Sequence, residues 1–371
     1  MSREGLPAEA EVVVVGAGIV GVCAALFLAR DGRETLLLER GIPFGDASGL
    51  NAGTLSLQVK TPRAWDLSRL GLALWARLAG KLEEDPGFTR CGGLRIALDE
   101  REQARLGASV QAQCAHGLEV HLLDGVTLRE QAPWLGPRVR AASRCEDDAY
   151  ASPLLAGPAL LRGAVAEGVA VCGECAVTHM QADGPGYRLH TPRGQVRCRH
   201  LVLAAGAATG ELAAMLGIPL PVLADLNMLH VTEPAPPIME GILTHVGGVL
   251  SLKQYPNGTC VIGGGWQGRG DAGDQAIHHE NLHHNLAIAA RAVPALADLR
   301  LVRSWTGLEA LVPDALPVAG EVPGRPGVYV AACARGGYTI GPAQAFIISE
   351  QIAGRSPPLD VAAFSPARLL S

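Results

Sequence analysis

Residues 11–40, EVVVVGAGIVGVCAALFLARDGRETLLLER, constrain the fold of this chain more than any other stretch. They predict a buried strand of consecutive valines, a Gly-rich turn, a helix over 19–30 and a second strand. Gly16, Gly18 and Gly21 fit the spacing G-x-G-x-x-G, which permits a tight turn, close approach to a pyrophosphate and close helix packing. The stretch therefore predicts a dinucleotide-binding unit.

Glu39 ends the second predicted strand. A carboxylate there accepts hydrogen bonds from both ribose hydroxyls of an adenosine and repels a 2′-phosphate, which argues against NADP. The first turn of the helix points its N–H groups at the pyrophosphate. The Gly-rich turn alone leaves NAD and FAD open, and a Gly-rich turn in an ordinary α/β domain is the plain alternative.

Length and composition exclude several classes of protein. A chain of 371 residues with 48% hydrophobic content can bury a large core, which predicts two domains. A formal net charge of −5 without a basic block argues against nucleic acid as a partner. No apolar run reaches the roughly 18 residues that span a bilayer, and the polar N-terminus is unlike a signal peptide. Nine cysteines without framework spacing indicate reduced thiols, so we expect a cytoplasmic protein.

Two short motifs are typical of metal or redox sites, but their context argues against that use. Cys172 and Cys175 form a C-x-x-C inside a strand pattern, which would point the two thiols to opposite faces. His279 and His283 form a formal H-E-x-x-H, the spacing of a zinc site on a helix. Glu280 would point away from both histidines, and no third ligand is signalled. We therefore expect no bound metal.

Three further segments would meet at the far end of a dinucleotide. Small residues over 204–207 let a strand end lie close to a cofactor, and the loop through 51–54 offers backbone donors. The last predicted strand runs through Gly336 and Gly337 into a helix with Pro342 in its first turn. The positive end of that helix would lie beside a flavin N1–C2=O edge, where negative charge develops on reduction.

These motifs, in this order, resemble those of the D-amino-acid-oxidase-like FAD amine oxidoreductases. The Gly-rich turn with Glu39 and Arg40 is followed by GDASGLNAGT, AAGA, WTGLEALVPDALPVAG and GGYTIGP. The resemblance covers nearly the whole chain. It implies an α/β protein with a discontinuous Rossmann-like FAD-binding domain and a substrate domain of antiparallel β-sheet plus helices. The family includes glycine and sarcosine oxidases and flavin subunits of opine, proline and hydroxyproline dehydrogenases.

The resemblance also implies domain boundaries and cofactor contacts. We expect an FAD-binding domain of 1–85, 145–218 and 306–371, and a substrate-binding domain of 86–144 and 219–305. Monomeric sarcosine oxidases attach their flavin to a cysteine in the region from Trp305 to Pro317, which here has none, so we expect noncovalent FAD. The residues expected to contact FAD are Gly16, Ala17, Gly18, Ile19, Val20, Gly21, Glu39, Arg40, Ser48, Asn51, Ala52, Gly53, Thr54, Val177, Ala205, Gly206, Gly336, Gly337, Tyr338 and Thr339.

Within the family, GLEALVPDALPV and LKQYPNGTCVIGGGW look most like the opine and hydroxyproline dehydrogenase subunits. We therefore expect oxidation of a secondary amine or amino acid, with a cyclic imino acid such as D-hydroxyproline or proline as substrate. Hydride would pass from the carbon next to nitrogen to flavin N5. The alternatives are an opine, glycine or sarcosine oxidase, a 2-hydroxy-acid-oxidising flavoenzyme, and an electron-transferring FAD subunit of a heteromeric complex. Partner subunits or an electron carrier are expected as well.

A cationic side chain should face the carboxylate of an amino-acid substrate. A glycine-oxidase-like enzyme has arginine after its Gly-Leu pair, whereas Glu309 takes that place here. Arg335 and Lys253 are the expected substitutes, with an ion pair to Glu309 as the alternative role of Arg335. His230 and Tyr255 are further candidates at the substrate, although each is also explained as a packed side chain.

Overall fold

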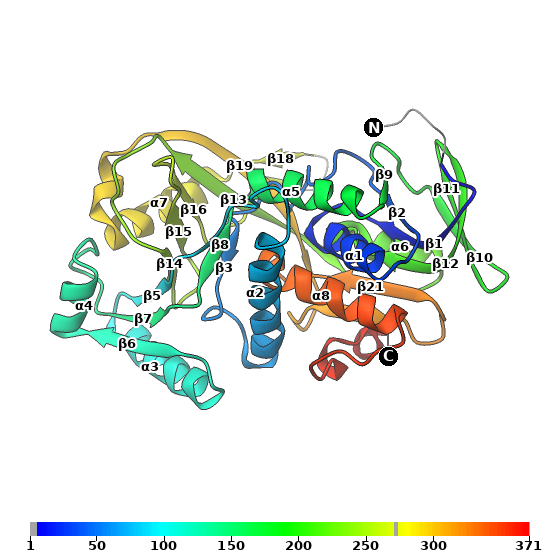
Figure 1. Ribbon diagram of the computed structural model, residues 1–371. Coiled ribbons are helices and arrows are strands. Elements are labelled where there is room, and N and C mark those ends of the chain that lie inside the picture. Colours follow the sequence, from blue (N-terminus) through cyan, green and yellow to red (C-terminus); the bar gives the residue numbers. More distant parts are fainter. Residues whose placement is uncertain (1–5, 271–273, 371) are drawn as a thin grey trace.

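The computed structural model describes residues 6–270 and 274–370, which form two main β-sheets with helices around them (Figure 1). The first sheet lies with both chain ends at the right of the view, the second lies at the left, and α2 (Trp65–Ala79) stands between them. This arrangement confirms the mixed α/β class expected from the sequence. The domain boundaries stay a prediction.

The first sheet has a parallel core. β1 (Glu9–Val15) pairs with β2 (Thr35–Leu38) on one edge and with β12 (Gly194–Leu203) on the other. β9 (Ala170–Cys172) extends the β2 edge, and β21 (Val328–Ala332) extends the β12 edge. The valines of β1 are buried on both faces, as expected of a central parallel strand.

Antiparallel strands complete the first sheet. β20 (Val318–Glu321) pairs with β21, and the hairpin of β10 (His179–Asp183) and β11 (Gly186–Thr191) pairs with the first half of β12. The sequence predicts separate strands for the two halves of β12. They form one strand because β1 pairs with residues 197–203 across both halves, while β11 and β21 share the other edge.

Helices cover both faces of the first sheet. α1 (Ile19–Arg30), which has the predicted bounds, packs on one face together with α5 (Pro153–Ala166) and α8 (Gly337–Ile352). α6 (Thr209–Met215) packs on the other face. α2 lies against α8 on the side of the second sheet.

α8 begins at Gly337, earlier than the expected start at Pro342, which lies inside the helix. A proline within a helix leaves the carbonyl four residues before it without an N–H donor. Here that carbonyl belongs to Tyr338, and it accepts a hydrogen bond from Trp75 Nε1 at 2.6 Å. The indole of α2 thus replaces the missing donor, so the helix can extend back to the Gly336 turn.

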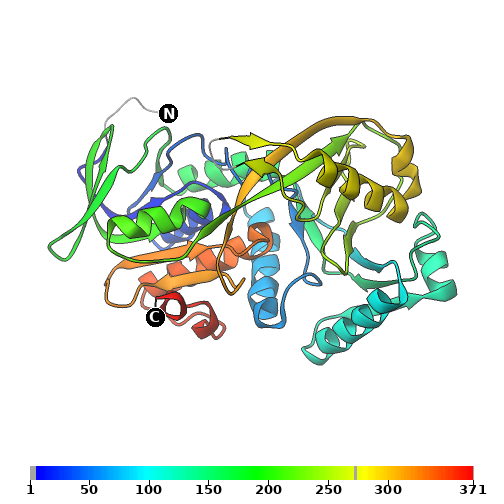
Figure 2. The same ribbon diagram turned by 180° about the vertical axis from the view of Figure 1, so that it is seen from behind.

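The second sheet is mostly antiparallel and is covered by α7 (His279–Ala292) on one face and α3 (Glu100–Ala115) on the other. Figure 2 shows its longest strands, β13 and β19, reaching toward the first sheet. The Pro-Asn-Gly-Thr sequence over 256–259 predicts a hairpin turn, and this turn joins β15 to β16. The strands in spatial order are β19 (Leu301–Leu311), β13 (Leu223–Thr232), β16 (Cys260–Gly263), β15 (Ser251–Gln254), β14 (Ile242–His245), β5 (Gly93–Ala97), β7 (Ala141–Cys145) and β6 (Val120–Asp124).

Smaller elements join the two sheets. β3 (Thr54–Leu55), β8 (Ala149–Ala151) and β4 (Phe88–Arg90) form a three-stranded sheet near α2. Within residues 6–270 and 274–370, no helix is long and apolar enough to cross a bilayer. The remaining short elements are β17 (Arg269–Gly270), β18 (Gln275–Ala276), α4 (Gly125–Gln131), η1 (Pro62–Ala64), η2 (Gly206–Ala208), η3 (Pro294–Asp298), η4 (Ala362–Phe364) and η5 (Pro366–Leu369).

Candidate functional site

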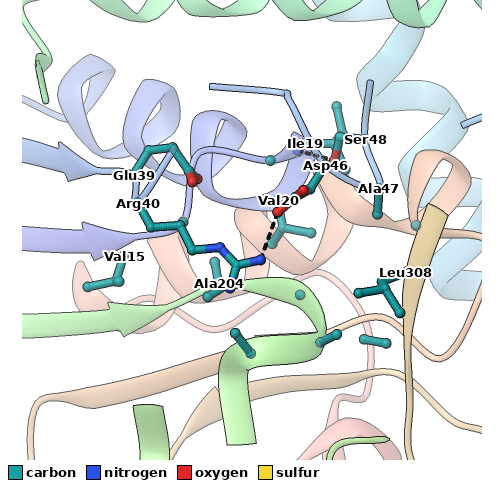
Figure 3. A pocket seen from close by; sticks show the side chains of 18 of the residues that line it. Val15, Ile19, Val20, Glu39, Arg40, Asp46, Ala47, Ser48, Ala204 and Leu308 are labelled. Carbon is teal, nitrogen blue, oxygen red and sulfur yellow. Dashed lines mark hydrogen bonds and ion pairs between the residues drawn. The ribbon is translucent and has the colours of Figure 1, made fainter. Parts of the chain in front are cut away.

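A cavity of about 280 Å³, called the first cavity below, lies at the carboxyl ends of three parallel strands. Val15 at the end of β1, Glu39 just after β2 and Ala204 just after β12 all line it (Figure 3). In open α/β sheets, ligands bind at this edge. The first cavity therefore lies where a nucleotide held by the Gly-rich turn would bind.

Gly16 and Gly18 line the first cavity, and Gly21 packs against Gly16 within the same turn. Gly16 has φ +103°, and a Cβ on it would lie 2.5 Å from Ala204 O. A Cβ on Gly18 would lie 2.9 Å from Ser48 Oγ, and one on Gly21 would overlap Gly16 O. The turn therefore needs glycine at positions 16 and 21, where a Cβ would meet backbone atoms, whereas a Cβ on Gly18 would displace the Ser48 hydroxyl that accepts a hydrogen bond from Ile19 N at 2.9 Å.

Glu39 and Arg40 line the first cavity where β2 ends. Glu39 Oε2 accepts a hydrogen bond from Ala17 N at 2.7 Å, and Oε1 accepts one from Gly41 N at 2.9 Å. A carboxylate has about four lone-pair sites, so each oxygen can also accept a hydrogen bond from a ribose hydroxyl. Arg40 donates to Asp46 Oδ2 at 2.9 Å, as the dashed line in Figure 3 shows. Glu39 can thus hold a ribose while keeping its backbone contacts.

The second cavity, of about 430 Å³, adjoins the first. Ala47, Asn51, Glu309 and Arg335 line both cavities. The other walls of the second cavity come from the 50–61 segment, the second sheet and the start of α8. A long ligand can therefore extend from the Gly-rich turn to the second sheet.

The N-terminus of α8 lies where the two cavities meet. Gly336 is its N-cap with φ +66°, and no side chain caps the helix. Gly337 and Tyr338 line the first cavity, whereas Gly336 and Thr339 line the second. The positive end of the helix dipole therefore favours a ligand group that becomes negative at this junction.

Lys60 lines the second cavity beside this helix end. A Cβ on Gly336 would overlap Lys60 Nζ, so the ammonium group contacts the Gly336 backbone. Burial lowers the pKa of Lys60 to about 8, although nearby Cys333, Glu309 and Asp148 raise it. Within the described part of the chain, Lys60 Nζ forms no hydrogen bond or ion pair.

A network of charged groups on β13 and β19 lies at the junction of the cavities. Arg335 forms an ion pair with Asp225. Asn227 Nδ2 donates to Asp225 Oδ2 at 3.0 Å and to Glu309 Oε2 at 2.7 Å. Asp225 and Glu309 are direct cross-strand partners, and burial raises the pKa of Glu309 although Arg335 lowers it. Asp225 thus neutralises Arg335, and Glu309 forms no ion pair with any described residue.

The family model DAO, described as FAD dependent oxidoreductase, matches residues 11–351. The chain belongs to this family. Its sequence is 27% identical to the B subunit of an opine oxidase of Rhizobium meliloti, over 97% of this chain and 98% of that protein. It is also 27% identical to a glycine oxidase of Pseudomonas aeruginosa, over 96% of this chain and 98% of that protein. These matches confirm the predicted resemblance, the FAD cofactor and the assignment as an FAD-dependent amine oxidoreductase.

Solved structures confirm the fold of this oxidoreductase. L-proline dehydrogenase from P. horikoshii superposes with a TM-score of 0.91 at 24% identity, covering 98% of each chain. Glycine oxidase from Geobacillus kaustophilus superposes with a TM-score of 0.88 at 24% identity, covering 98% of this chain and all of the other.

The first cavity of the oxidoreductase fits FAD on its own geometry, since it offers the glycine turn, the Glu39 carboxylate and the α8 N-terminus. Ala17, Gly21 and Gly53 line neither cavity, and Gly53 N instead donates to Asn51 Oδ1 at 2.7 Å. Noncovalent binding stays a prediction. The other residues expected at FAD line the first cavity (Gly16, Gly18, Ile19, Val20, Glu39, Arg40, Ser48, Asn51, Val177, Ala205, Gly206, Gly337, Tyr338) or the second (Asn51, Ala52, Thr54, Gly336, Thr339).

Lys253 and Tyr255 hydrogen-bond to the loop over residues 45–54, called the flavin-side loop from here on, and their expected role at the substrate stays a prediction. Lys253 is fully buried, and its Nζ donates to Ala52 O at 2.6 Å and to Thr54 Oγ1 at 2.8 Å. Tyr255 Oη donates to the same Ala52 O at 3.0 Å. Neither side chain lines a cavity. On β15, Lys253 shares the face of Ser251, which lines the second cavity, and Ala52 and Thr54 cover its ammonium group.

His230 is a buried strand residue that lines neither cavity, and its expected contact with a substrate likewise stays a prediction. Its Nδ1 lies 2.9 Å from Ser304 Oγ on the paired strand, and burial lowers the pKa of His230 to about 4. Arg335 does line both cavities, but its partner is Asp225 and not Glu309.

Of the two short motifs, the C-x-x-C differs from its expected geometry. β9 ends at Cys172, and Glu174 takes a left-handed φ of +51°, so the chain turns and brings Cys175 back beside Cys172. Burial and the Cys175 thiol raise the pKa of Cys172 to about 11, and both thiols are free. The prediction of opposite faces was therefore wrong. His279 and His283 are exposed on α7, and the described residues contain no group of three or more metal-binding side chains.

The sequence analysis missed Lys60 because this residue lies in no motif. The flavin-side loop was expected to end at Thr54, but the chain continues along the second cavity to Lys60. The sequence did offer one signal for this site: Lys60 is a single charged residue between apolar Val59 and the Thr-Pro pair that follows.

Replacing Lys253 with methionine should change how the stability of this oxidoreductase depends on pH. Burial lowers the pKa of Lys253 to about 7, below its ordinary value of 10.5. Between these two values the unfolded chain holds a proton that the folded chain lacks, so this lysine makes the free energy of unfolding rise with pH. Lys253→Met should remove that rise in urea titrations at pH 7, 8 and 9. Lys81→Met, at an exposed lysine, should keep it, and equal pH slopes in both variants would refute the assignment.

Proposed function

We propose that this oxidoreductase dehydrogenates a small secondary amine that carries a carboxylate, with a cyclic imino acid such as D-hydroxyproline or proline as the substrate. The observation that supports this most is the second cavity, which adjoins the α8 N-terminus and has both Lys60 and Glu309 in its lining. A zwitterionic amino acid matches such a pair of opposite charges. FAD, when bound, supplies the two-electron oxidant for the reaction.

The protein itself orients the substrate and excludes water. Leu50, Met228 and Leu229 give the second cavity apolar walls. Trp305 Nε1 donates to Leu50 O at 2.9 Å, which ties the flavin-side loop to β19. Lysine and carboxylate groups within such walls interact more strongly than they would in water.

A partner subunit or electron carrier is part of the proposal. Relatives of this chain are named as the B subunit of opine oxidase and the beta subunit of sarcosine oxidase, which also supports secondary amines as the substrate class. Exposed apolar side chains offer such a partner a contact surface. Leu154 and Val165 are exposed on α5, and Ile42, which closely follows Glu39 in the sequence, is 74% exposed. We further propose a cytoplasmic location, supported by nine cysteines that are all free thiols.

The test is anaerobic addition of candidate substrates to the yellow FAD-loaded protein. D-hydroxyproline or proline should bleach the flavin absorbance, while glycine and a 2-hydroxy acid should leave it unchanged. Admitting air afterwards tests oxygen as the acceptor, because a bleached protein that stays bleached in air passes its electrons to a carrier.

Other outcomes would change the assignment. Bleaching by octopine alone would select the opine alternative, and bleaching by the 2-hydroxy acid alone would overturn the proposal of an amine substrate. A colourless protein that cannot be reconstituted with FAD would contradict the cofactor itself.

A further inference from the structure

We propose that Lys60 and Glu309 form a two-point clamp for one amino-acid zwitterion, with Lys60 holding the carboxylate and Glu309 holding the secondary amine. This inference rests on the proposed function and deepens it by naming the substrate class. The expected class is a secondary amino acid with a single carboxylate.

Lys60 is the available cation of the site. Three lysine or arginine side chains in the described residues line the two cavities, namely Arg40, Arg335 and Lys60. Arg40 is paired with Asp46 and Arg335 with Asp225, whereas Lys60 has no partner among them. Its Nζ contacts the Gly336 backbone at the start of α8, so a carboxylate bound there would lie beside both the ammonium group and the helix N-terminus.

Glu309 is the available carboxylate of the site. It lines both cavities, and its Oε2 accepts a hydrogen bond from Asn227 Nδ2 at 2.7 Å. Across the strand pair, Asp225 forms the ion pair with Arg335, so Glu309 is left to balance a positive charge on a ligand. Asn227 fixes the carboxylate by bonding to both acids at once.

The clamp also gives Glu309 a chemical role. A secondary amine is protonated near neutral pH, and its nitrogen lone pair must be free before the neighbouring C–H bond can be oxidised. The N–H bond of the ammonium breaks, an O–H bond forms on Glu309, and the electron pair stays on nitrogen. The groups that face Glu309 are Arg335, Asp225, Lys60 and Asn227. Burial and Asp225 raise the pKa of Glu309, as suits a general base, although Arg335, Lys60 and Asn227 lower it.

The charge count of the site sets its selectivity. A cyclic imino acid has one carboxylate and one ammonium group, which Lys60 and Glu309 match. An opine has a second carboxylate, and the remaining cation, Arg335, is already bonded to Asp225. Proline-type substrates should therefore bind more tightly than opines.

The first experiment measures binding to the FAD-loaded protein, independently of turnover. Pyrrole-2-carboxylate, which has the carboxylate of proline but no basic amine, is titrated against the flavin absorbance. Lys60→Met should weaken its binding by about 10- to 100-fold. Lys60→Arg should restore binding to within about fivefold of the unmodified protein. Lys81→Met is the control, since this exposed lysine is remote from the cavity lining and its loss should change nothing.

The second experiment concerns Glu309. Glu309→Gln keeps the shape of the side chain and should leave the affinity for pyrrole-2-carboxylate within about threefold. Glu309→Gln should slow the anaerobic bleaching of the flavin by proline about 10²- to 10⁴-fold. The bleaching rate of the unmodified protein should fall toward low pH, and this fall should be absent in the variant.

Failure of the clamp and failure of the proposed function are distinguishable. If proline bleaches the unmodified protein and Lys60→Met binds the probe as tightly, the clamp alone is overturned. If no amine bleaches the unmodified protein, the proposed function fails and the clamp with it. If the Lys60→Met variant purifies without FAD, the affinities of Lys60→Arg and Lys60→Gln for pyrrole-2-carboxylate are compared instead. Lys60→Arg should bind the probe more tightly, and equal affinities would overturn the clamp.

Discussion

Replacing Gly16 with alanine is expected to abolish FAD retention and to lower the free energy of unfolding by about 2–6 kcal/mol. Gly16 follows β1 with φ +103°, and the new Cβ would lie 2.5 Å from Ala204 O and 2.7 Å from Ala205 Cα. Both are backbone atoms at the end of β12, so no side-chain rotation relieves the contact. The turn must open, and the first cavity then loses the wall expected to face the pyrophosphate.

Gly32→Ala is the matched control because it separates backbone strain from steric overlap. Gly32 has φ +76°, and a Cβ there would meet nothing within 4 Å. A left-handed alanine costs roughly 1–2 kcal/mol, so this variant should lose only that much stability and keep its FAD. Urea unfolding measures the stability, and flavin absorbance after desalting measures retention. Equal losses in Gly16→Ala and Gly32→Ala would show that the Ala204 contact does not matter.

The parts of the fold that were predicted from the sequence are those with local signals. α1 has the predicted bounds because its apolar run, the glycines before it and the turn after it lie within one short stretch. The 256–259 turn likewise joins its two strands as expected, because a Pro-Asn-Gly-Thr turn needs no distant partner.

The parts that were missed depend on contacts between distant segments. α8 extends past Pro342 only because Trp75, far away in the sequence, donates to Tyr338 O. The role of Lys253 depends on how the second sheet packs behind Ala52, which no periodicity records. The motif around Arg335 predicts that it lies near the cofactor, but its partner Asp225 lies on β13, far away in the sequence, and carried no signal.

Replacing Asp148 with asparagine is expected to lower the free energy of unfolding by about 2–5 kcal/mol at pH 8. Asp148 is 1% exposed, and burial raises its pKa to about 6, so it is ionised at pH 8. Its Oδ1 accepts from Leu57 N at 2.8 Å, and its Oδ2 accepts from Ser56 Oγ at 2.8 Å and Gln58 Nε2 at 2.9 Å. An asparagine places an NH2 group against at least one of these donors.

The surrounding network leaves little room for this asparagine to adapt. Gln58 cannot simply turn its amide, because Nε2 also donates to Gly93 O at 3.1 Å and Oε1 accepts from Ser143 Oγ. Asp147→Asn is the control: its exposed ion pair with Arg90, at 3.3 Å, should contribute only about 0–1 kcal/mol. Urea unfolding of both variants gives the comparison. The segment 56–58, which Asp148 anchors, leads directly to Lys60, so Asp148→Asn should also weaken the binding of pyrrole-2-carboxylate. If stability and affinity were both unchanged, Lys60 would be held in place by its cavity contacts alone.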